Sequence, residues 1–304
     1  MKIQTVRGEI QPSQLGITSC HEHLLWAVPA PYAGGDPDLG FEDPDQAVFE
    51  LLYFSEAGGS AVVEMTTSEI GRSPQALKTI SEKTNVHIIA ASGHHKDKFS
   101  AASLQGRSVD QIAQGIIADI MVGMDGIAIK AGVIKAATSH QEATESERRV
   151  IQAVGLAHLT TKAPVSTHTE EGTFALEQID LLMQAGVGAD NLLIGHLDRN
   201  LPMDTYLKIA DRGVWMGFDQ IGKTKYWADE ERARLIHTLF QHGYRRILLS
   251  EDTARKSSWH AFNPVVDGMA HVLKGFKKLL LGAGLGEEHL EQLLVKNPAV
   301  FFAY

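Results

Sequence analysis

The sequence Leu15-Gly16-Ile17-Thr18-Ser19-Cys20-His21-Glu22-His23-Leu24 has the form of an apolar strand that ends in His-x-His. Successive side chains of a strand point to opposite faces, so His21 and His23 would share one face while Glu22 points away from them. Two imidazoles on one face can chelate a divalent metal ion. Many His-x-His pairs are ordinary surface or core residues, so the other strands decide whether this pair is a metal site.

Short apolar segments of the same kind recur along the 304-residue chain, separated by longer amphipathic segments. The predicted strands are residues 17–23, 61–66, 86–92, 126–130, 164–168, 192–196, 214–219 and 247–252. The predicted helices are residues 44–57, 73–83, 108–122, 144–161, 173–185, 202–212, 230–242, 265–281 and 287–295. Strands that alternate with helices of this length indicate a parallel sheet.

Eight such units without a linker or composition break predict a (β/α)8 TIM barrel, formed as one α/β domain over residues 1–304. A doubly wound open sheet is the alternative, but no glycine-rich phosphate-binding sequence follows the first strand. In a barrel the loops after the strands build the active face. We therefore expect the loop at residues 29–43 to border the site.

Composition excludes several classes of function. The net charge of -9 and the lack of a dense Lys/Arg run argue against a nucleic-acid partner. A single cysteine, Cys20, fits a reducing compartment. The first residues show no export signal and no apolar run has transmembrane length, so we expect a cytoplasmic protein without a membrane partner.

Titratable residues are scarce within the predicted strands but occur where the strands end. The first strand carries His21 and His23, and later strands end in four further residues: Lys130, His168, His196 and Asp252. The carboxyl ends of barrel strands converge on one pit, where enzymes of this fold carry out their chemistry. At each position alone a structural role is more common, but all six together favour a site.

This residue set suits two borderline divalent ions such as zinc. The ammonium form of Lys130 is not a metal ligand. A neutral lysine, however, can add carbon dioxide and become a carbamate, whose two oxygens can bridge a pair of metal ions. Two adjacent metal ions lower the pKa of the water between them and so generate hydroxide at neutral pH.

The order of these residues along the chain resembles the phosphotriesterase family of the amidohydrolase superfamily, in its phosphotriesterase-homology and lactonase branch. Further similarity lies in Val63-Glu64-Met65-Thr66-Thr67, Ser166-Thr167-His168-Thr169 and Ile194-Gly195-His196. The resemblance implies that His21, His23 and Asp252 hold the more buried metal ion and that His168 and His196 hold the more exposed one. It also implies that carboxylated Lys130 and a hydroxide bridge the two ions.

The predicted function is hydrolysis of lactones or related esters, with Asp252 as general base as well as metal ligand. Family members that cleave phosphotriesters have a histidine where this chain has Gln220. Those that cleave acyl-homoserine lactones have a tyrosine where His95 stands. Neither class is matched, which favours sugar lactones, including phosphorylated ones. A phosphotriesterase, organophosphate or aryl-ester hydrolase remains the alternative.

Substrate contacts are expected from His95, Lys223 and Arg255. Lys223 and Arg255 follow the last two strands, where barrels commonly bind anionic groups, although both are equally well explained as solvated loop charges. Glu64 is expected to support a ligand histidine rather than to act as an acid. The resemblance also implies a homodimer, and a metal-loaded binding protein without turnover is the hypothesis from a different class.

Overall fold

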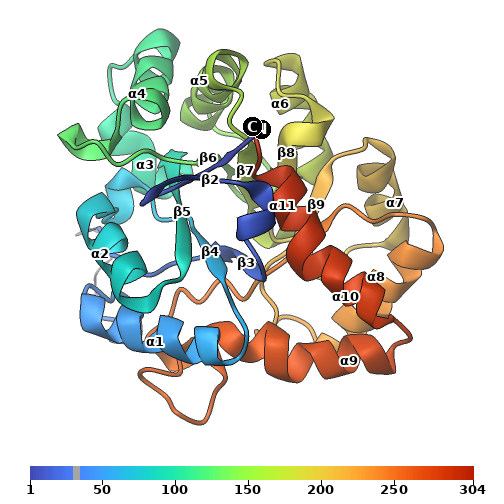
Figure 1. The fold of residues 1–304 in the computed structure, drawn as a ribbon. Helices are drawn as coiled ribbons and strands as arrows, with labels where there is room; N and C mark the ends of the chain where they lie inside the picture. Colours follow the sequence, from blue (N-terminus) through green and yellow to red (C-terminus); the bar gives the residue numbers. More distant parts are fainter. Residues whose placement is uncertain (30–34) are drawn as a thin grey trace.

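Eight parallel strands form the centre of the computed structural model, which describes residues 1–29 and 35–304 (Figure 1). Each strand pairs with its neighbours in chain order. The strands are β3 (Thr18–Glu22), β4 (Ala61–Glu64), β5 (His87–Gly93), β6 (Val133–Thr138), β7 (Val165–Thr169), β8 (Leu192–Ile194), β9 (Trp215–Phe218) and β10 (Ile247–Leu249). The Asp252 amide, just past β10, donates to the His21 carbonyl oxygen at 3.2 Å. The predicted (β/α)8 barrel is confirmed.

Helices surround the barrel and cover the outer face of the sheet (Figure 1). They are α1 (Pro44–Glu56), α2 (Pro74–Thr84), α3 (Asp97–Leu104), α4 (Val109–Met121), α5 (Glu145–Thr161), α6 (Ala175–Gln184), α7 (Met203–Asp211), α8 (Asp229–Gln241), α9 (Lys277–Gly282), α10 (Glu287–Glu291) and α11 (Asn297–Phe301). Capping boxes start α4 and α5, where Ser108 pairs with Gln111 and Thr144 with Glu147. A π-helical turn interrupts each of the last two predicted helices, at Val272–Phe276 within 265–281 and at Gln292–Lys296, which extends one residue past 287–295.

The fourth strand lies seven residues later than predicted. Gly126 ends a 3-10 turn, and residues 127–130 form a loop in which Ile127 is 37% exposed, whereas all of β6 is buried. Both segments are apolar and both contain a lysine, so alternation of side chains does not separate them. Parallel strands covered on both faces are nearly continuous apolar runs, and 131–137 is the longer such run.

The amino-terminal end of the barrel is closed by elements that the sequence analysis did not predict. The hairpin of β1 (Ile3–Thr5) and β2 (Gly8–Ile10) packs there, with Val6 N donating to Ile88 O at 2.9 Å. Figure 1 views the molecule from this end, where α11 lies beside the hairpin. Ile3, Phe301 and Phe302 are buried in the same cluster as interior barrel residues such as Val63 and Val133. Catalytic groups must therefore lie at the opposite end.

Part of the loop predicted to border the site, residues 30–34 of 29–43, lies outside the described residues. The described remainder contacts the segment after β10, because Asp38 accepts hydrogen bonds from Ser257 N at 2.7 Å and Ser257 Oγ at 2.8 Å. None of the helices in the described part of the chain combines the length and the hydropathy of a bilayer-spanning segment.

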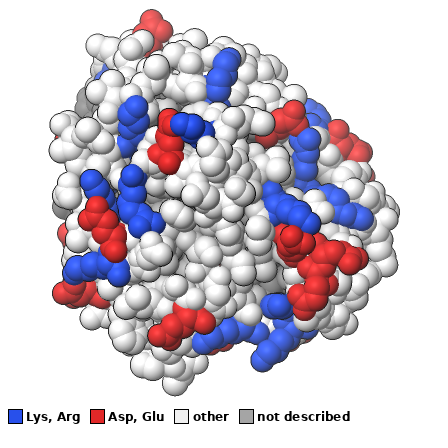
Figure 2. All heavy atoms as spheres, viewed as in Figure 1, with Lys and Arg blue, Asp and Glu red and all other residues white. Residues whose placement is uncertain are grey.

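On the face seen in Figure 1, Lys and Arg side chains alternate with Asp and Glu (Figure 2). Ion pairs such as Lys2–Glu9 at 2.5 Å contribute to this mixture. This face therefore presents no extended basic patch of the kind that binds nucleic acid.

Candidate active site

A cavity of about 730 Å³ opens at the carboxyl ends of the strands. Its wall includes His168, His196 and Asp252, together with residues from the loops after β7, β8, β9 and β10. The cavity lies at the end of the barrel where this fold places its chemistry.

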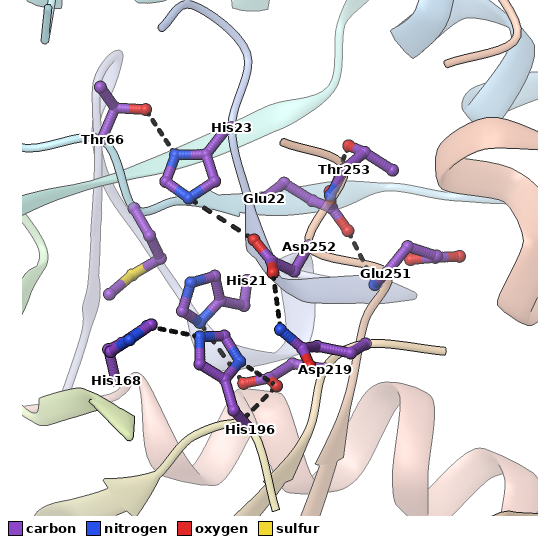
Figure 3. Close-up of polar contacts among 12 residues, drawn as sticks. His21, Glu22, His23, Thr66, His168, His196, Asp219, Glu251, Asp252 and Thr253 are labelled. Carbon is purple, nitrogen blue, oxygen red and sulfur yellow. Dashed lines mark hydrogen bonds and ion pairs between the residues drawn. The ribbon is translucent and has the colours of Figure 1, made fainter. Parts of the chain in front are cut away.

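His21, His23 and Asp252 converge beside this cavity (Figure 3). One ligand atom from each lies within 4.8 Å of the others, and His23 Nε2 is 3.6 Å from Asp252 Oδ1. All three side chains are buried. Burial lowers the pKa of both histidines, which keeps the imidazoles in the neutral form that binds metals. The donor set is one that zinc and similar ions prefer.

Neighbouring side chains fix the orientation of the histidines. Asp219, which directly follows β9, accepts a hydrogen bond from His196 Nδ1 at 2.7 Å and lies 3.4 Å from His21 Nδ1. On the other side, His23 Nδ1 contacts Thr66 Oγ1 at 2.8 Å, and Thr66 donates to Glu64 at 2.5 Å. Glu64 therefore supports a candidate ligand histidine through Thr66. Such partners set the tautomer and direction of ligating imidazoles.

His168 and His196 form a second convergent pair (Figure 3). His196 Nε2 lies 2.8 Å from His168 Nδ1, and His168 Nε2 lies 3.3 Å from Glu170. Burial, together with the charge of His196, lowers the pKa of His168 to about 3. His168 is therefore neutral near pH 7, and both imidazoles lie at the cavity wall.

His196 and Asp252 lie just beyond their strands, not within them as predicted. β8 ends at Ile194 and β10 at Leu249, and the two residues adopt left-handed backbone conformations with φ of 59° and 48°. Residues other than glycine seldom occupy this region, and such strained positions concentrate at functional sites. The strained turns direct these two side chains toward the site.

Lys130 does not join these residues, and its predicted place at the end of the fourth strand is wrong. It precedes β6 and lies near Glu9 of the hairpin, at the amino-terminal end of the barrel. The lysine that enters the barrel is Lys135, in the middle of β6 and fully buried. Its Nζ donates to Met65 O, just past β4, at 3.0 Å. Burial lowers the pKa of Lys135 to about 8.

Glu22 faces away from the two histidines, as the strand pattern predicts. Its carboxylate accepts hydrogen bonds from Glu251 N at 3.0 Å and from Thr253 N at 2.9 Å (Figure 3). These two residues flank Asp252, so Glu22 fixes the segment that carries the candidate ligand.

The other predicted site residues line the cavity or lie close to it. Gln220 Nε2 and Lys223 Nζ both donate to Asp252 Oδ2, at 3.2 and 2.5 Å. Arg255 forms ion pairs with Asp36 at 2.8 Å and Asp38 at 3.3 Å. The ring of His95 lies 4.8 Å from that of His168. Lys223 and Arg255 thus have carboxylate partners within the chain.

Several residues that position the site were not predicted from the sequence. Asp219 lies at the end of the seventh barrel strand, so the rule that identified the other strand-end residues would have found it. Arg232, on α8, is fully buried between Asp198 and Asp229, at 3.0 and 2.7 Å, and Asp198 holds the Gln220 amide at 3.0 Å. No local pattern reveals such a pairing of distant residues.

Comparison with known proteins places this geometry in a family. The profile of the phosphotriesterase family matches residues 1–302. The phosphotriesterase homology protein of Escherichia coli (strain K12) is 34% identical over 292 residues, which cover 94% of this chain and 98% of that protein. N-acetyltaurine hydrolase of Rattus norvegicus is 32% identical over 344 residues, covering 100% of this chain and 98% of that protein.

A solved structure shows the same architecture. The crystal structure of a lactonase from Listeria monocytogenes superimposes with a TM-score of 0.94 and 31% sequence identity, covering 100% of this chain and 99% of that one. Both the family profile and these relatives extend over nearly the whole sequence. The chain belongs to the phosphotriesterase family.

Proposed function

We propose that this protein is a metal-dependent hydrolase that opens lactones and cleaves related carboxylic esters. The observation that carries the proposal is the convergence of His21, His23 and Asp252 at the cavity, beside the His168–His196 pair. Similarity to the Listeria lactonase supports the choice of a lactone over a phosphotriester. Gln220 stands where phosphotriester-cleaving members are expected to have a histidine, which also disfavours that alternative.

The residues present fit a pair of divalent ions, for which zinc is the proposed identity. His21, His23 and Asp252 would hold the first ion and His168 and His196 the second, and a carbamate formed by carbon dioxide on Lys135 would supply further oxygen ligands. Lys135 takes the role predicted for Lys130 because it is the buried lysine in the barrel. When bound, the ions would lower the pKa of a water molecule and polarise the ester carbonyl.

Side chains of the protein would accept the proton that the attacking water releases. Although burial opposes its ionisation, Lys223 and the nearby histidines hold the pKa of Asp252 far below its ordinary value. Asp252 is therefore an ionised acceptor whose Oδ2 is positioned by Lys223 Nζ and Gln220 Nε2. We infer that Asp252 accepts the proton of the attacking water and that Lys223 and Gln220 hold its carboxylate in place.

Hydrolysis of an amide is the second candidate, because the rat relative named N-acetyltaurine hydrolase extends over the whole chain. An amide and a lactone share the carbonyl that such a site would attack. They differ in the leaving group, which is an amine in the first case and an alkoxide of the same molecule in the second.

The test is a substrate panel on protein loaded with zinc and bicarbonate. It comprises pentono- and hexonolactones with and without a phosphate, paraoxon, aryl esters and N-acetyltaurine. We expect a lactone to have the highest kcat/KM, and an Asp252→Asn variant to lose at least about 100-fold in kcat as expected for removal of a general base. Preference for paraoxon would establish the phosphotriesterase alternative. Two bound metal ions per chain with no turnover of any substrate would instead indicate a binding protein.

A further inference from the structure

The charged residues on the cavity wall are mostly paired. Lys223 contacts Asp252 at 2.5 Å, Arg255 contacts Asp36 at 2.8 Å, and His271 contacts Asp229 at 2.8 Å. The acids are paired as well: Glu170 contacts Lys96 and His168, Glu171 contacts His140 at 3.8 Å, and Asp267 contacts Lys274 at 3.7 Å. Most charged side chains of the cavity wall therefore already have a partner of opposite charge within the protein.

Two cations on the same wall, Arg199 and Lys225, lack a carboxylate partner among residues 1–29 and 35–304. The remaining residues, 30–34, contain no Asp or Glu. The Nε atom of Arg199 is buried and has no hydrogen-bond partner in the described chain. Lys225 is exposed, so water can solvate its ammonium group, whereas the buried Nε of Arg199 lacks any hydrogen-bond partner among the described residues and is the atom that points to a ligand.

Tyr226 holds these two cations in position. The guanidinium carbon of Arg199 lies 3.5 Å from the centre of the Tyr226 ring, and Lys225 Nζ lies 4.6 Å from it. Stacking on an aromatic ring fixes the plane of a guanidinium group and leaves its N–H edge free to donate. A planar fork of N–H donors binds carboxylate, phosphate or sulfonate oxygens in pairs.

Arg199 is also close in sequence to the candidate metal ligands. It follows His196 by three residues in the loop after β8, and Tyr226 lies in the loop after β9. Both residues line the cavity that includes His168, His196 and Asp252. A substrate with its reactive carbonyl near those residues could therefore extend an anionic group toward Arg199.

We propose that Arg199 and Lys225, mounted on Tyr226, form a subsite for an anionic group of the substrate, which is a phosphate, sulfonate or carboxylate. This inference rests on the proposed hydrolase function, because it concerns the substrate of the same cavity. The sequence predicted an anion contact at Arg255, but the guanidinium group of Arg255 is paired with Asp36 and Asp38. The proposal assigns this contact to Arg199, which has no carboxylate partner in the described part of the chain.

The kinetic test compares matched substrates that differ by one charged group: N-acetyltaurine against N-acetylethanolamine, and a 5-phosphorylated pentonolactone against the same lactone without phosphate. We expect Arg199→Met to lower the anionic-to-neutral ratio of kcat/KM by about 10- to 100-fold, mainly through KM, as expected for loss of hydrogen bonds to a charged group. Arg199→Lys should restore part of the ratio, because lysine keeps the charge but loses the fork.

Arg255→Met is the matched control, since it removes the other arginine of the cavity wall. The proposal is overturned if Arg199→Met leaves the ratio unchanged, and the anion contact returns to Arg255 if only Arg255→Met lowers it. Either result leaves the hydrolase function intact. The pair of substrates with the larger ratio identifies the anionic group as sulfonate or phosphate.

A binding measurement decides the proposal even if no substrate is turned over, which would be a failure of the hydrolase function alone. Methanesulfonate, acetate and inorganic phosphate are titrated calorimetrically into the metal-loaded wild type and Arg199→Met. Weaker binding of at least one anion to the variant supports the subsite, and equal binding of all of them overturns it. Thermal unfolding of each variant verifies that the fold is retained.

Discussion

Lys135 is fully buried, and its ammonium group has one hydrogen-bond partner, the carbonyl oxygen of Met65. A buried charge with so little compensation is unfavourable, which is why burial lowers the pKa of this lysine to about 8. Addition of carbon dioxide to the neutral amine would replace this unfavourable cation with a carbamate anion, which divalent ions could hold. The burial that disfavours the ammonium form of Lys135 thus favours the neutral amine that carboxylation requires.

The variant Lys135→Met tests this role, because methionine fills a similar volume without a nucleophilic nitrogen. We expect the variant to bind substoichiometric metal and to lose at least about 100-fold in kcat/KM, a loss at the upper end of that for supporting residues of metal sites. Lys130→Met is the matched control and should keep wild-type metal content, measured by inductively coupled plasma mass spectrometry. If Lys130→Met lost metal and activity while Lys135→Met kept both, Lys130 would be the carboxylated residue instead.

The pH dependence of reconstitution follows from the same residue. Only the neutral amine adds carbon dioxide, and the neutral fraction of a group with a pKa of about 8 increases as the pH rises through that value. At a fixed concentration of dissolved carbon dioxide, metal-free protein should therefore regain activity faster as the pH increases from 7 to 9, by about tenfold across the whole interval for a pKa of about 8. A rate that is constant or decreases with pH would contradict this expectation.

At the scale of elements, Glu22 connects the first barrel strand to the segment after the last one. Besides the amides on both sides of Asp252, it accepts hydrogen bonds from Ser19 Oγ at 2.8 Å and Thr253 Oγ1 at 2.6 Å. Together with the hydrogen bond from Asp252 N to His21 O, this buried carboxylate therefore fixes the position of Asp252 relative to β3. His21 and His23 belong to the stretch that starts in β3, so the same carboxylate sets the geometry of the candidate metal ligands.

We expect Glu22→Gln to loosen this connection, because one carboxylate oxygen becomes an N–H donor that faces other donors. The free energy of unfolding should fall by about 1–3 kcal/mol, the cost of leaving buried polar groups unsatisfied. Metal affinity should fall by about 10- to 100-fold, measured by competition with a chromogenic chelator. Glu9→Gln, at a half-exposed position in the hairpin, is the control; equal effects of the two substitutions would rule out the positioning role.

At the scale of the whole molecule, the first candidate metal site lies where the first barrel strand, β3, meets the last one, β10. We call this junction the seam of the barrel. His21 and His23 come from the first barrel strand and the residue after it, and Asp252 follows the last strand, so a bound ion would connect the two ends of the sheet. The direct contact across this seam includes the hydrogen bond from Asp252 N to His21 O at 3.2 Å. Metal binding would therefore stabilise barrel closure as well as supply chemistry.

Chelation should lower the thermal stability of the entire barrel. A ligand present at 100 times its dissociation constant stabilises the native state by about 2.7 kcal/mol, so its removal should shift Tm downward by a few degrees in a protein of this size. Hydrogen exchange should increase first in β3 and β10. The Asp252→Asn variant, which lacks one ligand, should show a smaller shift on chelation; an unchanged Tm in the wild type would refute the link between metal and seam.

The sequence by itself determined the barrel and most of the residues that meet in the cavity. Alternating apolar strands and amphipathic helices leave few other architectures, because each sheet face must be covered by the helices that connect the strands. Strand ends in such a barrel share one pit, so His21, His23, His168, His196 and Asp252 could be grouped without coordinates. Glu22 could be excluded from the metal-facing set by side-chain alternation alone.

Only the tertiary structure decided that Lys135 rather than Lys130 lies inside the barrel. It also decided that Arg199 rather than Arg255 lacks a carboxylate partner within residues 1–29 and 35–304. Residues 126–130 and 131–137 are both apolar and both contain a lysine, and packing against β5 and β7 places β6 at Val133–Thr138 in the second segment. Arg255 and Arg199 are equivalent as isolated loop arginines, but Asp36 and Asp38, more than 200 residues away in sequence, pair with the first. Such choices depend on long-range contacts and the burial of charge, which local sequence patterns do not encode.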